Sequence, residues 1–265
     1  MNRLMDIYQQ QFKVTLAIQL QYRVGLAIWM IYIILNPVIY LVVWQSAAGD
    51  GELAGYGAQD FAAYFIVLLV VTHFTDMWHM WTYEYLIREG QMSMRLVRPL
   101  HPIHVDIIEN LSNKFLMSFV VLPAVILLSL VFQPRLEPPL WAIPAFVLSL
   151  LTAGALQFLT GWVVAMAAFW TTRIIAINEV YFLAVLIFSG QFAPLDLLPA
   201  PLPTIANLLP FRWVIAFPVE LLLGRLTVEQ AVMGFGAQLF WLAVVLVLWA
   251  TIWKAAVRRY SAVGG

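Results

Sequence analysis

Long apolar stretches joined by short polar connections dominate the chain. Six of these stretches have the length of a membrane-spanning helix, which needs about 20 mostly apolar residues. The fourth is the clearest, because no Asp, Glu, Lys or Arg occurs between Pro138 and Thr172. The pattern predicts an all-α polytopic membrane protein with spans over residues 24–45, 60–81, 114–132, 141–169, 175–190 and 231–253.

The segment before the first span has a different pattern. Residues 3–22 repeat apolar side chains at helical spacing, with polar residues over much of the remaining surface. Such a pattern is typical of an amphipathic helix that lies along a membrane interface. We therefore predict an interfacial helix over residues 3–22, with a solvated helical leader as the alternative.

Residues 83–113 connect the second and third spans. Gly90 can end one helix, and Pro99 would stop the next, so a short helix is expected over residues 91–97. The segment is both basic and apolar (Arg88, Arg95 and Arg98; Met92, Met94, Leu96 and Val97). A short helix presenting both to the cytosol suits docking on a partner protein. Attachment to the membrane surface by the same basic residues is an equal alternative.

The connection between the last two spans, residues 191–227, is apolar but rich in proline. Pro194, Pro199, Pro210 and Pro218 are among its prolines, and proline at this density prevents one continuous spanning helix. Irregular backbone at membrane depth is tolerated where protein covers it or where it lines a cavity. The segment therefore predicts short re-entrant helices in the outer leaflet, with a packed cap outside the bundle as the alternative.

Composition supports a membrane protein over a soluble one. The chain is 63% hydrophobic and 11% charged, with a mean hydropathy of +0.88, whereas soluble domains carry roughly 25% charged residues. The net charge is zero, which gives no electrostatic case for binding nucleic acid. Cysteine is absent, which excludes disulfides and thiolate metal sites.

The distribution of Lys and Arg predicts the orientation. With the N-terminus inside, eleven of the 14 basic residues fall on the cytoplasmic side, and only Arg135, Arg212 and Arg225 fall on the other. Cytoplasmic segments of membrane proteins carry such an excess of Lys and Arg. Both termini are therefore expected in the cytoplasm, which agrees with an even number of spans.

Three polar residues are candidates for an intramembrane role: His73, Asp76 and Glu179. His73 and Asp76 are three residues apart and would share a helix face, whereas His79 would lie on the far face. One helix cannot bring all three side chains onto one ion, so no metal site is predicted. A polar contact with another helix is the simpler interpretation. Outside the bundle, Glu220 is expected to pair with Arg212 or Arg225.

The two irregular segments carry a family resemblance. EGQMSMRLVRPLHP, after the second span, is followed by SGQFAPLDLLP and LLPFRWVIAFPVELLLG in the outer segment. In order and spacing they resemble permeases of type-2 ABC exporters, in particular the daunorubicin-resistance-type group, over essentially the whole chain. The resemblance implies six helices per subunit and two permease subunits, identical or related, around the translocation path.

The resemblance also implies roles for particular residues. A cytoplasmic coupling helix would dock on the ATPase subunit, and the re-entrant helices would lie on the outer side. The coupling residues would be Glu89, Gly90, Gln91, Met94, Arg95, Arg98, Pro99 and His101. The outer segment would include Pro194, Asp196, Pro199, Pro210, Pro218 and Glu220.

The sequence lacks the G-x-x-x-x-G-K-[ST] loop that holds ATP phosphates. The chain is therefore not expected to be an enzyme or to bind a cofactor, and ATP and Mg²⁺ would be bound by two copies of a partner ATPase. The predicted function is the permease of an exporter of apolar or amphipathic substrates in the bacterial inner membrane. The alternatives are a proton-coupled secondary transporter, with Asp76, Glu179 or His73 carrying protons, and a membrane-embedded enzyme.

Overall fold

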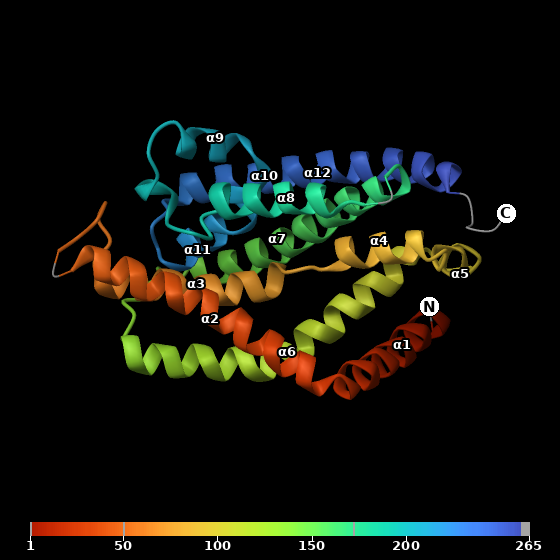
Figure 1. Ribbon diagram of the computed structural model, residues 1–265. Coiled ribbons are helices and arrows are strands. Elements are labelled where there is room, and N and C mark those ends of the chain that lie inside the picture. Colours follow the sequence, from red (N-terminus) through yellow and green to blue (C-terminus); the bar gives the residue numbers. More distant parts are fainter. Residues whose placement is uncertain (1, 50, 172, 261–265) are drawn as a thin grey trace.

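The computed structural model describes residues 2–49, 51–171 and 173–260. Its regular structure within these residues is helical, which confirms the all-α prediction (Figure 1). The long helices are α1 (Asn2–Gln21), α2 (Arg23–Ala48), α3 (Ala58–Thr75), α6 (Pro102–Phe132), α7 (Ala142–Ala165) and α12 (Val228–Arg259). The shorter ones are α4 (His79–Arg88), α5 (Met92–Leu96), α8 (Ile175–Phe188), α9 (Leu202–Leu208), α10 (Pro210–Val214) and α11 (Ala216–Leu222). A 3-10 turn, Met166–Phe169, extends α7.

Five helical segments of the described chain are long and apolar enough to cross a membrane, and a sixth is reached if the bent pair α9 and α10–α11 counts as one. The fifth predicted span forms α8, which has only 14 residues. At 1.5 Å per residue α8 is about 21 Å long, shorter than the roughly 30 Å hydrocarbon core. Ser189 caps α8, and Gly190, with a φ of 87°, turns the chain away from the helical path.

Two further predicted boundaries differ from the structure. The second span is interrupted, because α3 ends at Thr75 and α4 begins at His79. The third helix begins at Pro102 rather than near residue 114, so the predicted connection 83–113 contains its first turns. Proline suits the first helical position, and the His101 ring accepts a hydrogen bond from the Ile103 amide at 3.2 Å. Pro102 and the capping His101 therefore allow α6 to begin about twelve residues before the predicted span.

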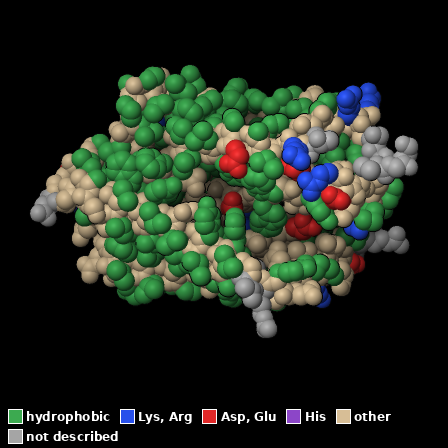
Figure 2. Space-filling view, in the orientation of Figure 1, with side chains coloured by type: hydrophobic (Ala, Val, Ile, Leu, Met, Phe, Trp, Pro, Cys, Tyr) green, Lys and Arg blue, Asp and Glu red, His purple; other side chains and the backbone are tan. Residues whose placement is uncertain are grey.

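Helix α3 lies at the centre of the bundle and packs against α2, α6, α7 and α11. Its residues from Phe61 to Leu69 are almost entirely buried. By contrast, α2 and α6 expose large apolar side chains over much of their length, such as Ile126 and Leu130 of α6. Figure 2 shows hydrophobic side chains over most of one face, with Lys and Arg gathered towards the end that carries α5. Such a surface needs lipid or another subunit to cover it.

The proline-rich segment forms α9, α10 and α11 at the end of the bundle opposite α5 (Figure 1). The chain bends by 73° between α9 and the α10–α11 pair. Helix α11 is buried against α3 and α7. Arg212 pairs with Glu220 at 3.0 Å, while Arg225 lies over the ring of Tyr56, 3.5 Å from its centroid. A re-entrant arrangement in the outer leaflet stays a prediction.

The other residues predicted for the outer segment occupy different environments. Pro194 and Pro218 are buried, whereas Asp196 and Pro199 are exposed. Pro210 occupies the first turn of α10, where a missing amide proton costs nothing.

Candidate functional site

The predicted docking segment, residues 89–101, lies at the end of the bundle opposite α9 and contains the five-residue helix α5. We call it the coupling segment. Its outward side is formed by Met94, Val97, Arg98 and Pro99, with Met94 61% and Val97 82% exposed. Met92, on the inward side, is completely buried. The segment therefore presents an apolar surface with one neighbouring cation.

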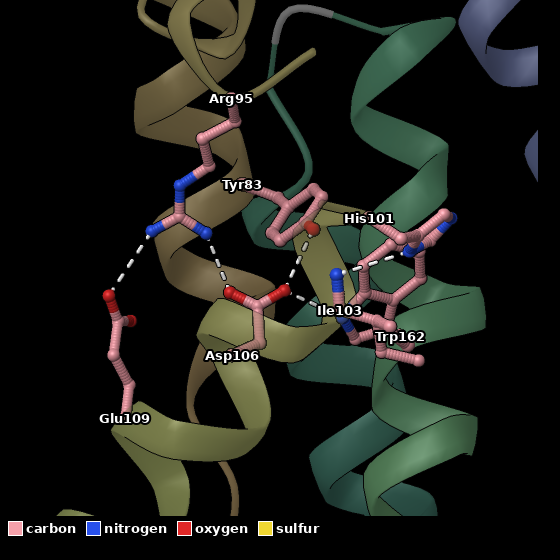
Figure 3. A network of polar contacts seen from close by, with 7 residues as sticks. All are labelled: Tyr83, Arg95, His101, Ile103, Asp106, Glu109 and Trp162. Atoms are coloured by element: carbon pink, nitrogen blue, oxygen red, sulfur yellow. Dashed lines mark hydrogen bonds and ion pairs between the residues drawn. The ribbon is translucent and has the colours of Figure 1, made fainter. Parts of the chain in front are cut away.

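Arg95 does not belong to that outward side, which corrects the expectation that the short helix presents this basic residue to the cytosol. Its guanidinium contacts the Asp106 carboxylate at 2.6 Å and the Glu109 carboxylate at 3.4 Å (Figure 3). Burial by itself would lower the pKa of Arg95, but the two carboxylates outweigh burial, so this pKa is raised. Arg95 fastens α5 to α6.

Asp106 accepts hydrogen bonds from three different helices besides its own. One carboxylate oxygen faces Arg95 of α5, and the other accepts from the Tyr83 hydroxyl of α4 and the Trp162 indole of α7, both at 2.8 Å (Figure 3). The Asp106 side chain is fully buried. A buried carboxylate is tolerated only when its lone pairs are satisfied, and here the same contacts join α4, α5, α6 and α7.

The end of α12 holds the other side of α5. Tyr260 follows the last helical residue, and its hydroxyl donates to the Gly90 carbonyl at 3.1 Å. The same hydroxyl accepts from the Ser93 amide at 3.1 Å and lies 2.9 Å from the Ser93 hydroxyl. Gly90 has a φ of 68°, which favours glycine. The coupling segment is therefore fixed from two sides.

The remaining predicted coupling residues point in different directions. Glu89 pairs with Arg88 at 3.1 Å, and Gln91 donates to the Tyr85 hydroxyl at 3.1 Å. His101 turns inward, with its ring 4.6 Å from that of Trp253. Burial, together with the charge of the neighbouring His104, lowers the pKa of His101. His101 therefore shapes the start of α6 rather than the exposed surface.

The three intramembrane candidates do not form one cluster. The His73 ring lies 2.9 Å from the Ser118 hydroxyl of α6. Asp76 is the residue that ends α3, at the break before α4. Glu179 is exposed on α8, and no ion pair joins it to Arg173 in the part of the chain that the structure describes.

Sequence reasoning missed Asp106, Tyr83, Trp162 and Tyr260. Only Asp106 left a signal in the sequence, as a carboxylate among the apolar residues of IHVDII in a segment interpreted as a connection between spans. Tyr83 and Trp162 resemble ordinary interfacial aromatics in the sequence. Tyr260 lies far from the segment it contacts.

A bundle of long apolar helices, with a short anchored segment exposed at one end, is typical of a polytopic membrane protein. Residues 25–264 match the model of the family described as ABC-2 family transporter protein. The chain therefore belongs to the ABC-2 transporter family. This family supplies the membrane-spanning subunit of a transporter, which implies an ATPase partner and dimerisation. Comparison with curated proteins and with solved structures gives no match.

Proposed function

We propose that the chain is the permease of an ATP-driven exporter in the bacterial inner membrane, with both termini in the cytoplasm. ATP and Mg²⁺ bind to two copies of a separate ATPase, and a second permease subunit completes the path. The observation that carries the proposal is the coupling segment, which exposes Met94 and Val97. Its rear is bonded to Asp106 of α6, which also binds α4 and α7, and to Tyr260 at the end of α12.

Docking on a protein suits this segment better than attachment to anionic lipid. Lipid attachment relies on clusters of about four to eight basic residues. Here Arg95 forms ion pairs with Asp106 and Glu109, and Arg88 pairs with Glu89, so neither is available to lipid headgroups. Arg98 remains, beside the exposed side chains of Met94 and Val97. This arrangement fits a groove on a partner protein that has both apolar and acidic side chains.

Movement of the partner would reach the bundle by two routes. A displacement of α5 acts through the Arg95–Asp106 pair on α6, and through Tyr83 and Trp162 on α4 and α7. Tyr260 passes the same displacement to α12. Rigid helices held by such contacts shift as units. ATP binding and hydrolysis would thus change the population of inward- and outward-accessible states.

The cargo is apolar or amphipathic. The long spans offer few fixed charges with which to recognise a strongly ionic solute. The chain is only 11% charged, and most of the charged residues lie near helix ends or in connections.

The test is a mild-detergent pull-down of the tagged chain from its native host, comparing wild type with Val97→Asp. We expect a soluble ATPase carrying a phosphate loop to co-purify with wild type and to be lost with Val97→Asp. Leu140→Asp is the matched control, because Leu140 is 87% exposed and lies just before α7, whose first turns are at the end of the bundle opposite α5 (Figure 1). It should retain the ATPase.

Two results would overturn the proposal. If no ATPase is recovered even after cross-linking, the chain does not work with one, and proton-coupled transport becomes the function to test. If Val97→Asp retains the ATPase as well as Leu140→Asp does, the coupling segment is not the docking surface.

A further inference from the structure

The interruption between α3 and α4 is built into the fold. Residues 76–78 leave the helical path within Ala58–Arg88, a stretch long and apolar enough to cross a membrane. Backbone groups left unpaired in lipid are costly. Two side chains of α6 compensate: the Asn110 amide and the Lys114 ammonium donate to the Asp76 carbonyl at 3.1 and 2.7 Å. On the other side, a Cβ added to Gly161 of α7 would overlap the sulfur of Met77.

The Asp76 carboxylate lies at this break. Its side chain is exposed, and within the described residues no basic side chain forms an ion pair with it within 4.0 Å. The neighbouring cation is engaged, because Lys114 donates at 2.7 Å both to the Asp76 carbonyl and to the Asn110 side-chain oxygen. A ligand arriving at this break therefore meets an exposed carboxylate, while the Lys114 ammonium is directed to two uncharged oxygens.

An exposed carboxylate at membrane depth cannot face lipid tails without a large cost. The face that carries Asp76 must therefore turn to water or to another subunit. Figure 2 shows acidic side chains over α8 and beside the α3–α4 break, within an otherwise hydrophobic and partly hollowed region. Glu179, the acidic residue of α8, is likewise exposed. Broken helices and intramembrane charges mark substrate routes in transport proteins.

We propose that Asp76 binds a positively charged group of the cargo where the α3–α4 break lines a water-filled path. This inference rests on the proposed transport function and adds the charge of the group that the path accepts. An amphipathic cation satisfies both the apolar surroundings and the free carboxylate. If Asp76 serves only to neutralise Lys114, no preference for arriving cations follows.

The chain contains no cysteine, so single thiols can be introduced without other changes. We would place Phe74→Cys, at a residue that is 36% exposed and two positions before Asp76, in native membranes. Its reaction rates with a cationic and an anionic methanethiosulfonate would be measured. The cationic reagent should react faster, and Asp76→Asn should lower the cation-to-anion rate ratio roughly tenfold, because the lost charge acts on the two reagents in opposite directions. Asp76→Glu should restore the ratio.

Ile126→Cys provides the reference for a thiol in an apolar environment, because Ile126 is 62% exposed on α6. If Phe74→Cys reacts no faster than Ile126→Cys, the break does not face water and the proposal fails. It also fails if Asp76→Asn leaves the rate ratio unchanged, since the carboxylate then acts only on Lys114. Neither result bears on ATPase co-purification, so failure here is distinguishable from failure of the proposed function.

Discussion

The substitution Asp106→Asn tests whether one carboxylate holds the coupling segment. An amide offers one oxygen where the carboxylate offers two. If that oxygen faces Tyr83 and Trp162, the amide NH2 group faces the Arg95 guanidinium, and two donors meet. The variant keeps the volume of the side chain but removes the charge opposite Arg95, which retains only Glu109 at 3.4 Å.

The magnitude follows from the geometry. Removing one partner of a buried ion pair costs about 3–5 kcal/mol. Arg95 keeps 14% of its side-chain surface exposed and keeps Glu109, so we expect roughly 2–3 kcal/mol against the docked state of α5. Because each 1.4 kcal/mol is a factor of ten, amide exchange over residues 92–97 should accelerate roughly 30- to 150-fold.

Hydrogen–deuterium exchange with mass spectrometry measures this on the purified chain. Glu109→Gln is the control, because it removes only the longer contact and should accelerate exchange only a few-fold. Equal exchange in wild type and Asp106→Asn, with the fold intact, would show that the ion pair does not hold α5. A uniform rise across all helices would indicate general unfolding instead.

Tyr260→Phe keeps the ring but removes the hydroxyl that bonds the coupling segment. At about 1 kcal/mol per hydrogen bond, hydrogen–deuterium exchange of the amides of residues 90–93 should accelerate at least tenfold. Unchanged exchange would contradict the role of α12. Gly161→Ala should lower the folded yield on fluorescence-detected gel filtration modestly, because its Cβ would displace the flexible thioether end of Met77, whereas Gly25→Ala, with open space around it, should not. The pKa of His101 is lowered in the folded chain, so the unfolded chain binds more protons, and stability should fall as pH drops below about 6.5. In His101→Gln this part of the pH dependence of the melting temperature should disappear. An unaltered dependence of the melting temperature on pH would exclude His101 as its source.

Much of the bundle is predictable from local pattern. Runs of twenty or more apolar residues produce α2, α6, α7 and α12, because only a helix satisfies its own backbone in lipid. The break after Thr75 was not predictable, because no Pro or Gly marks it. It depends on Asn110 and Lys114 of α6, and on Gly161 of α7, which are 32 or more residues away in sequence.

The candidate site was predictable as a segment but not as a set of contacts. The basic and apolar composition of residues 83–113 indicated a docking segment there, and the family resemblance implied residues 89–101. Which side of a five-residue helix faces outward is decided by partners elsewhere, and Asp106 and Tyr260 decide it here. Docking, orientation and the re-entrant outer segment remain predictions.

The length of α8 has a consequence for the surrounding bilayer. With 14 residues, it is about 9 Å shorter than a typical hydrocarbon core, and Val180 and Leu183 on its surface are exposed. Lipid accommodates a short hydrophobic element by thinning around it. Where α8 meets lipid, headgroups of the two leaflets come closer together, so an amphiphile that crosses there has a shorter apolar distance to travel.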